Sequence, residues 1–373
     1  MKIKGFIAIV LACAVAAALP GHALAGASIP AGMVEPGWED HFRSAIFKIA
    51  ETDFEDGLKM LDAYIAKFPR KPEGYFFYAA GVQEKIQKLN NLADLERFKK
   101  YAGECRKICK DNLAKKPGDT VSRMYLGAVN GYAGLLEARQ RNLFRAFMDA
   151  VEAKGDLERA MAERPDLADV QFGLGMVYYF ASRKGAEEGG AVAWVITKFI
   201  TQGRDMRKEA LEMIRRPVEA GTLSEDYARA ALMWISLYEK KYDRARELAE
   251  YISKKFTRDA GSRWVKGRLA YLNGDYAEAR RMFSESQEIL RKRGVAMSRY
   301  KDLEIAIKFT EMRQSMDRRQ WDGAEDIRRA IDDWLSGEPK ISMEYQDEKN
   351  LLGYWRSEAD NARKSMTFVT GGK

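Results

Sequence analysis

The chain has 373 residues, of which 63 are Lys or Arg and 55 are Asp or Glu, which gives a formal net charge of +8 at neutral pH. A basic balance is typical of nucleic-acid-binding proteins, but here basic and acidic residues alternate, as in MDRRQWDGAEDIRRAIDD at residues 316–333. Such alternation indicates solvated helix faces, so no nucleic-acid partner is expected. The length suffices for a large buried core.

Residues 1–25 have the three parts of a secretory signal. Lys2 and Lys4 precede an apolar run that ends at Pro20, and the small residues from Ala23 to Ala25 form a cleavage site. The run is shorter than the roughly 20 apolar residues that span a bilayer. We therefore predict a cleaved signal peptide and an exported, periplasmic protein. Cys13, which follows Val-Leu-Ala, leaves a lipid anchor at the outer membrane as an alternative.

The remaining sequence predicts an all-α chain. Proline is scarce, with 9 residues, and apolar residues recur at helical spacing, as at Phe144, Phe147, Met148 and Val151. The β-hairpin signature, in which segments of alternating polarity flank an Asn-Gly turn, is missing from the sequence. After an N-terminal extension at residues 26–37, helices are expected from Trp38 onward.

Small residues and prolines recur at fixed intervals between residues 38 and 180. Gly57 and Pro69, Cys105 and Pro117, and Ala153 and Pro165 are each 12 residues apart, and Ala79, Gly127 and Gly175 follow one another at intervals of 48. An internal period of this kind indicates stacked helical hairpins.

An insert at about residues 181–204 interrupts this series. It contains a mostly apolar stretch at residues 191–200, AVAWVITKFI, with Gly189 and Gly190 before it and Gly203 after it. The stretch is too short to span a bilayer. Three interpretations remain open for it and its large side chains Trp194 and Phe199: a plug of the core, a lid over a binding site, or a contact with a membrane or partner.

Beyond the insert the period shortens. Tyr242 and Tyr276, Ala245 and Ala279, and Met233 and Gly267 are each 34 residues apart, and residues 264–283 read WVKGRLAYLNGDYAEARRMF. This pattern resembles the tetratricopeptide repeat, a 34-residue helical hairpin with small residues where its two helices meet and often a terminal proline. The resemblance is strongest at residues 227–290 and weaker elsewhere from Trp38 to Leu335.

The resemblance implies a right-handed superhelical solenoid over residues 38–335, with about seven hairpins, followed by a C-terminal helix and tail at residues 336–373. Between Ala79 and Cys105 the chain has 26 residues where the family has 12. Because two antiparallel helices share the excess, each central helix should be about two turns longer than in an ordinary repeat.

Residues with catalytic chemistry are few. Without the signal peptide the only histidine is His41, and the glycines at residues 173–175 and 185–190 follow no predicted strand, which a phosphate-binding loop requires. We therefore predict no enzyme activity, no cofactor and no metal site.

A stacked repeat presents a concave surface lined by first-helix residues. The register of the resemblance places on it Phe76, Tyr132, Phe172, Tyr179, Trp234, Tyr238, Trp264, Arg268 and Tyr271. Aromatic residues and arginine are enriched at protein interfaces, although such side chains also pack helix against helix. The resemblance implies a non-catalytic scaffold of the cell envelope that binds a protein partner in this groove. The alternatives are a ligand-binding accessory subunit of an envelope transport or polysaccharide-export system, and an envelope hydrolase.

Cys105 and Cys109 take positions that Ala153 and Leu157 hold in the next repeat, so both are expected in the core. Export makes a disulfide between them an alternative. Helical side chains four residues apart have Cβ atoms about 5–6 Å apart, however, whereas a relaxed disulfide needs roughly 3.5–4.5 Å. A zinc site would need two further ligands.

Overall fold

The computed structural model describes residues 33–89, 91–140, 142–187, 194, 197–295, 301–320, 323, 325–329, 357–358 and 360–365. Within these residues the chain forms helices and turns and no strand, which confirms the predicted all-α class for this part. The predicted signal peptide at residues 1–25 and residues 26–32 of the predicted extension lie outside the described residues.

The chain divides between Ile235 and Ser236 into two compact units, here called unit 1 and unit 2. The helices of unit 1 are α2 (Glu39–Ala50), α3 (Phe54–Lys67), α4 (Pro72–Lys88), η3 (Leu92–Asp94), α5 (Leu95–Lys115), α6 (Thr120–Arg139), α7 (Leu143–Glu163), α8 (Ala168–Glu187), the π-type turn η4 (Thr197–Thr201) and α10 (Arg207–Ala220). Helix α11 (Glu225–Tyr238) contains the boundary. Unit 2 continues with α12 (Tyr242–Lys255), α13 (Ala260–Leu272), α14 (Tyr276–Lys292) and α15 (Lys301–Asp317).

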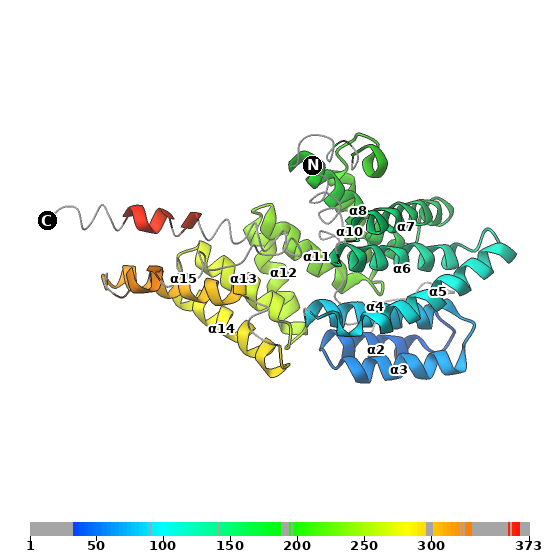
Figure 1. Ribbon diagram of the computed structural model, residues 1–373, viewed down its shortest axis with the longest axis horizontal. Coiled ribbons are helices and arrows are strands. Elements are labelled where there is room, and N and C mark those ends of the chain that lie inside the picture. The colour runs from blue at the N-terminus through cyan, green and yellow to red at the C-terminus, as the bar shows by residue number, and fades with distance from the viewer. Residues whose placement is uncertain are drawn as a thin grey trace. The chain divides into compact units, whose positions relative to one another are not determined.

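Helices that follow one another in the chain pack together in pairs. In unit 1 these pairs are α2 with α3, α4 with α5, α6 with α7, and α8 with α10, and in unit 2 α13 packs against α14 (Figure 1). An apolar helix face cannot be buried without a neighbour, so within each unit the paired helices bury their apolar sides against one another. This arrangement agrees with the helical-repeat architecture predicted from the sequence.

The central helices are longer than those of unit 2. Helices α6 and α7 have 20 and 21 residues, whereas α12 and α13 have 14 and 13. This difference is about seven residues, or two helical turns, whereas against α14 and α15, of 17 residues each, it is three to four residues, or about one turn. The lengthening has the direction that the 48-residue spacing predicted.

The recurring prolines stand at helix ends. Pro69, Pro117 and Pro165 each follow the residue that caps the C-terminus of α3, α5 and α7. Proline has no backbone N–H and clashes with a preceding helical turn, so it cannot continue the helix. At the next helix start, Asp119 accepts a hydrogen bond from the backbone N–H of Ser122 at 3.1 Å and so caps α6.

The recurring small residues stand where paired helices approach most closely. A Cβ atom added to Gly127 on α6 would lie 3.1 Å from the backbone oxygen of Ala153 on α7, and one added to Gly175 on α8 would lie 2.9 Å from that of Ala210 on α10. Contacts of this length exclude a side chain. The 48-residue interval therefore marks the helix crossings.

Part of the predicted N-terminal extension belongs to the core of unit 1. Met33 and Val34 are buried, and the hydroxyl of Tyr125 on α6 donates a hydrogen bond of 2.5 Å to the Met33 carbonyl oxygen. Nearby, the hydroxyl of Tyr64 donates to a carboxylate oxygen of Glu73 at 2.5 Å. The burial of both residues and the bond from Tyr125 hold residues 33 and 34 in the interior of unit 1.

Unit 2 ends in helical fragments. Residues 325–329 and 360–365 are helical, and Glu358 forms a 3.0 Å ion pair with Arg313 on α15. Residues 360–365 lie within the predicted C-terminal helix. Trp321 and Ala324, which mark the predicted last hairpin, lie outside the described residues.

Candidate functional site: an aromatic cavity in unit 1

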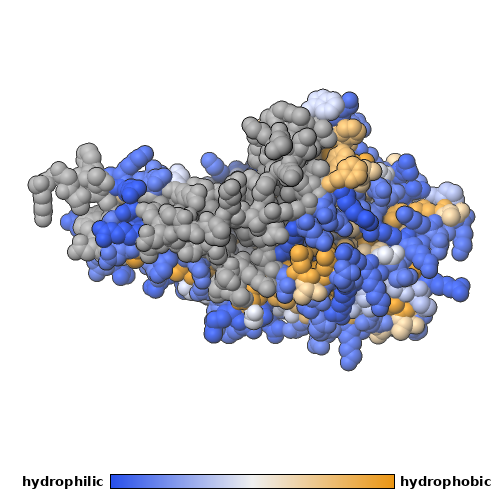
Figure 2. Space-filling model, in the orientation of Figure 1, coloured by the Kyte–Doolittle hydropathy of each residue, from blue (hydrophilic) through white to orange (hydrophobic). Residues whose placement is uncertain are grey.

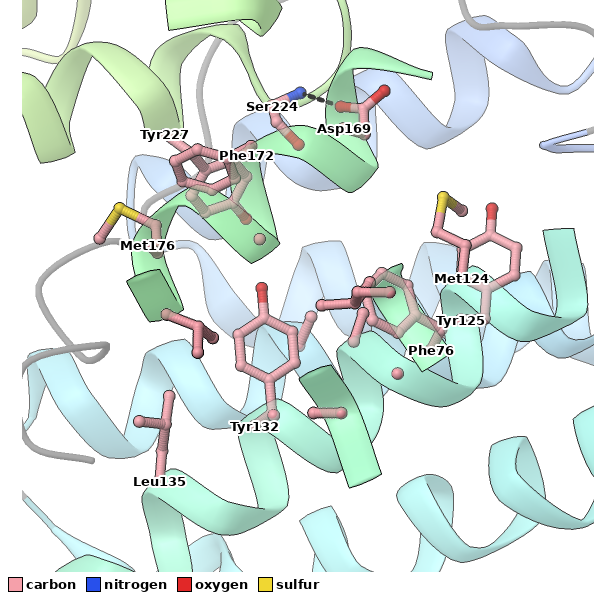
Figure 3. A pocket seen from close by; sticks show the side chains of 18 of the residues that line it. Phe76, Met124, Tyr125, Tyr132, Leu135, Asp169, Phe172, Met176, Ser224 and Tyr227 are labelled. Atoms are coloured by element: carbon pink, nitrogen blue, oxygen red, sulfur yellow. Dashed lines mark hydrogen bonds between the residues drawn. The ribbon is translucent and has the colours of Figure 1, made fainter. Parts of the chain in front are cut away.

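Unit 1 contains a partly open cavity of about 160 Å³. Helices α4, α6, α7 and α8 and the start of α11 line it, and Met33 and Ile200 complete its wall (Figure 3). Six aromatic residues contribute to the lining: Phe76, Phe77, Tyr125, Tyr132, Phe172 and Tyr227.

Small residues on the facing helices create the space. Gly131 on α6, Ala153 on α7 and Gly173 on α8 all line the cavity. A Cβ atom added to Gly131 would meet only the Cβ of Ala153, at 3.9 Å, so the position faces open space. The cavity therefore exists because helices with small residues here pack around a volume that no side chain fills.

The aromatic rings pack against one another and so hold the cavity wall. The ring of Phe76 lies 5.0 Å from that of Tyr125 and 5.9 Å from that of Tyr132, and the Phe172 and Tyr227 rings are 6.5 Å apart. Aromatic pairs at such distances are stabilising. The result is a largely apolar surface on rigid helices, the usual character of a small-molecule site.

Asp169 is the carboxylate of the cavity wall. One of its oxygens accepts hydrogen bonds from the Thr222 hydroxyl and from the Ser224 backbone N–H, both at 2.9 Å. Figure 3 shows the bond from Ser224. Its Oδ2 atom is buried and has no hydrogen-bond partner among the described residues. Burial raises the pKa of Asp169, and the hydrogen bonds from Ser224 and Thr222 oppose that shift. Asp169 thus ties α8 to the segment that leads into α11.

We expect two substitutions of Asp169 to differ. Asparagine keeps an oxygen acceptor for Thr222 and Ser224 and removes the buried charge, whereas alanine removes both hydrogen bonds, at a cost of about 1–3 kcal/mol. A carboxyl whose folded pKa is raised stabilises the fold below its unfolded pKa, and this contribution is lost as pH rises through the folded pKa. Asp169→Asn should therefore be at least as stable as the parent at pH 7, with a smaller decline in stability above pH 4. Urea unfolding at several pH values measures both effects, and equal destabilisation by the two variants would contradict this account.

Three of the nine predicted groove residues meet in the cavity: Phe76, Tyr132 and Phe172. Tyr179 on α8 is buried instead, and its ring lies 5.2 Å from that of Phe180. Trp234 and Tyr238 are half-buried on α11.

Trp264, Arg268 and Tyr271 belong to the interior of unit 2. The ring of Trp264 lies 6.2 Å from that of Phe283, and the Arg268 guanidinium lies over the Tyr271 ring at 5.6 Å. All three side chains are buried, which matches the helix-packing interpretation of such residues. A groove that joins all nine residues stays a prediction.

Several residues of the cavity wall were not predicted from the sequence. Tyr125 stands seven residues before Tyr132, two turns back on the same face of α6, so helical spacing was an available signal. Tyr227 and Asp169 lie at the starts of helices, where no periodicity marks them. Met33 had no signal, because it precedes the first repeat.

The described part of the insert faces both inward and outward. Ile200 is buried in the cavity wall, whereas Trp194 and Phe199 are 56% and 49% exposed. The Lys198 ammonium lies 4.5 Å from the centre of the Trp194 ring, and the Phe199 ring lies 5.9 Å from that of Phe147 on α7. Figure 2 shows apolar side chains gathered at the surface above α7 and α8. Residues 191–193 and 195–196 lie outside the described residues.

Cys105 and Cys109 are free thiols buried on α5, as the core interpretation predicted. A hydrogen bond with Cys105, together with burial, raises the pKa of Cys109, so its thiol stays protonated and unreactive. In the part of the chain that the structure describes, no group of three or more His, Cys, Asp or Glu residues is arranged to hold a metal ion.

No helix among the described residues combines the length and apolar character needed to cross a bilayer. A comparison with protein-family models finds none that matches this chain, and a comparison with curated proteins finds no similar sequence.

Proposed function

We propose that this chain is a non-catalytic binding protein of the bacterial cell envelope, and that the cavity of unit 1 takes up the apolar part of a small ligand. The observation that carries the proposal is the cavity itself, in which four helices direct aromatic side chains at one unfilled volume. This is the ligand-binding alternative of the sequence analysis, an accessory subunit of an envelope transport or export system.

The size of the cavity suits one ring or a short branched chain. Apolar cavities of roughly 150 Å³ bind benzene-sized ligands. Burying apolar surface there contributes about 25 cal/mol per Å². Because the lining is mostly carbon, the binding energy would come from this burial, and polar groups would set the orientation.

The proposal is tested with N-phenyl-1-naphthylamine, an uncharged apolar dye whose fluorescence rises on leaving water. The cavity is partly open, so the single phenyl ring of the dye can enter it while the larger naphthyl group stays at its mouth. Saturable binding with a stoichiometry of one per chain is the expected result. Linear uptake without saturation, or no uptake, would count against a ligand site.

The insert favours the membrane as the source of the ligand. Lys198, Trp194 and Phe199 are exposed, and tryptophan with lysine is the side-chain combination found at membrane interfaces. Phe144 and Met148 on the neighbouring α7 are 75% and 42% exposed and extend this apolar surface. We propose that this exposed surface makes a peripheral contact with the bilayer.

Vesicle sedimentation checks the membrane contact. The protein should sediment with vesicles of phosphatidylethanolamine and phosphatidylglycerol. Most of the double variant Trp194→Ala with Phe199→Ala should stay in the supernatant, because the apolar area that these side chains bury in the bilayer is lost. Leu272→Ala, which removes an exposed apolar side chain of unit 2, is the matched control. Retention that is unchanged in the double variant would refute the contact.

A second candidate function is the scaffold predicted from the sequence, in which a protein partner occupies the aromatic groove. The exposed Phe144 and Met148 favour it, since apolar patches also mark protein interfaces. Capture of one envelope protein by the parent protein, and not by the variant Gly131→Leu, whose leucine fills the cavity, would support this candidate. Membership of the tetratricopeptide-repeat family, the right-handed superhelix, the cleaved signal and the periplasmic location belong to the same proposal.

A further inference from the structure

Two phenol hydroxyls face the cavity without a hydrogen-bond partner among the described residues: those of Tyr132 on α6 and Tyr227 on α11. Figure 3 shows the Tyr132 hydroxyl directed across the cavity toward Phe172 and Tyr227. The third tyrosine of the wall, Tyr125, is fully buried and donates to Met33, whereas Tyr132 and Tyr227 are half-buried and border the open volume. Tyr132 and Tyr227 therefore leave two donors for a molecule in the cavity.

Both hydroxyls remain protonated donors. Burial raises the pKa of Tyr132, and the nearby Glu84 raises it further. Burial also raises the pKa of Tyr227, with smaller contributions from Glu84 and Tyr132. In Figure 3 Tyr227 lies across the cavity from the Tyr132 hydroxyl, so an acceptor group of a ligand placed between them faces both phenols.

The charges around the cavity exclude an anionic ligand. The described residues that line the cavity include no Lys or Arg. They include one carboxylate, that of Asp169. Glu84 is buried nearby and forms a 2.9 Å ion pair with Lys88. A carboxylate or phosphate would lose its hydration here and meet the Asp169 carboxylate, and no cation of the described wall would compensate that loss.

We infer that the ligand is a neutral amphiphile, with an apolar body in the aromatic cavity and an uncharged acceptor oxygen, a carbonyl or ether, bonded by Tyr132 and Tyr227. This inference rests on the proposed ligand-binding function and names the ligand class. Esters, ketones and ethers of hydrocarbon rings or chains belong to it, and free fatty acids do not.

Calorimetric titration with four ligands of one ring size tests the inference: toluene, acetophenone, benzoate and benzylammonium. Acetophenone should bind about fivefold to a hundredfold more tightly than toluene, the effect of two added hydrogen bonds, and benzoate should bind more weakly than toluene. In Tyr132→Phe with Tyr227→Phe, which keeps both rings, the ratio of acetophenone to toluene affinity should fall to about one while toluene affinity is kept.

The outcomes separate the two proposals. Without toluene binding to the parent, the proposed function itself fails. If toluene binds but the ratio survives in the double variant, the function stands and the assignment of the two hydroxyls is wrong. Tighter binding of benzoate or benzylammonium than of acetophenone overturns the neutral ligand class.

Discussion

Replacement of Gly131 by leucine should lower the affinity of unit 1 for N-phenyl-1-naphthylamine at least about tenfold. The position lines the cavity, and a Cβ atom there meets only the Cβ of Ala153 at 3.9 Å, so the leucine side chain has open space to enter. It then occupies volume that the dye needs. Losing burial of a group of this size costs about 1.5–3 kcal/mol, and 1.4 kcal/mol is a factor of ten in affinity.

Gly103→Leu is the matched control. Gly103 lies on α5, is exposed, and has no atom within 4 Å of an added Cβ. Both changes replace a helical glycine and raise helix propensity by the same amount, so only the cavity distinguishes them. Fluorescence titration of the parent and the two variants with the dye measures the three affinities. Unchanged binding by Gly131→Leu, or an equal loss in Gly103→Leu, would refute the cavity as the dye site.

The fold was predictable from the sequence because its markers are local and physical. Pro69, Pro117 and Pro165 end helices through their missing N–H, and Gly127 and Gly175 stand where two backbones nearly touch. Each effect depends on residue type alone. The intervals between these residues in the sequence therefore predicted which helices pair and that the central helices are lengthened.

The candidate site was predictable only in part. The repeat register identifies the helix face of Phe76, Tyr132 and Phe172, because neighbouring first helices present equivalent positions. It does not identify an empty volume, which depends on how closely Gly131 and Ala153 approach from different helices.

Residues outside the repeat register were beyond prediction for another reason. Met33 reaches the cavity through a hydrogen bond with Tyr125, 92 positions away in the chain. In the insert, the neighbours Phe199 and Ile200 have opposite environments, one exposed and one buried. A π-type turn sets which of the two faces inward, and its register does not follow the 3.6-residue period on which the sequence analysis relied.

The close approach at Gly127 leads to a test of the helix pairing itself. Gly127→Ala should destabilise unit 1 by about 1–2 kcal/mol, although alanine is the better helix former. The added Cβ would lie 2.9 Å from Cγ of Leu157 and 3.1 Å from the Ala153 backbone oxygen, so α6 and α7 must separate. Overpacking of this kind exceeds the gain in helix propensity, because a backbone atom cannot move aside as a side chain can.

Gly131→Ala, one turn later on α6, should stabilise unit 1 where Gly127→Ala destabilises it. Its Cβ enters open space, and the unfolded chain loses freedom, so the free energy of unfolding should rise by about 0.5–1 kcal/mol. Hydrogen exchange of the α6 and α7 amides, followed by mass spectrometry in both variants, measures the local change without assuming that units 1 and 2 unfold together. Equal effects of the two alanines would mean that α6 and α7 are not paired as described, since only the distance to α7 distinguishes these positions.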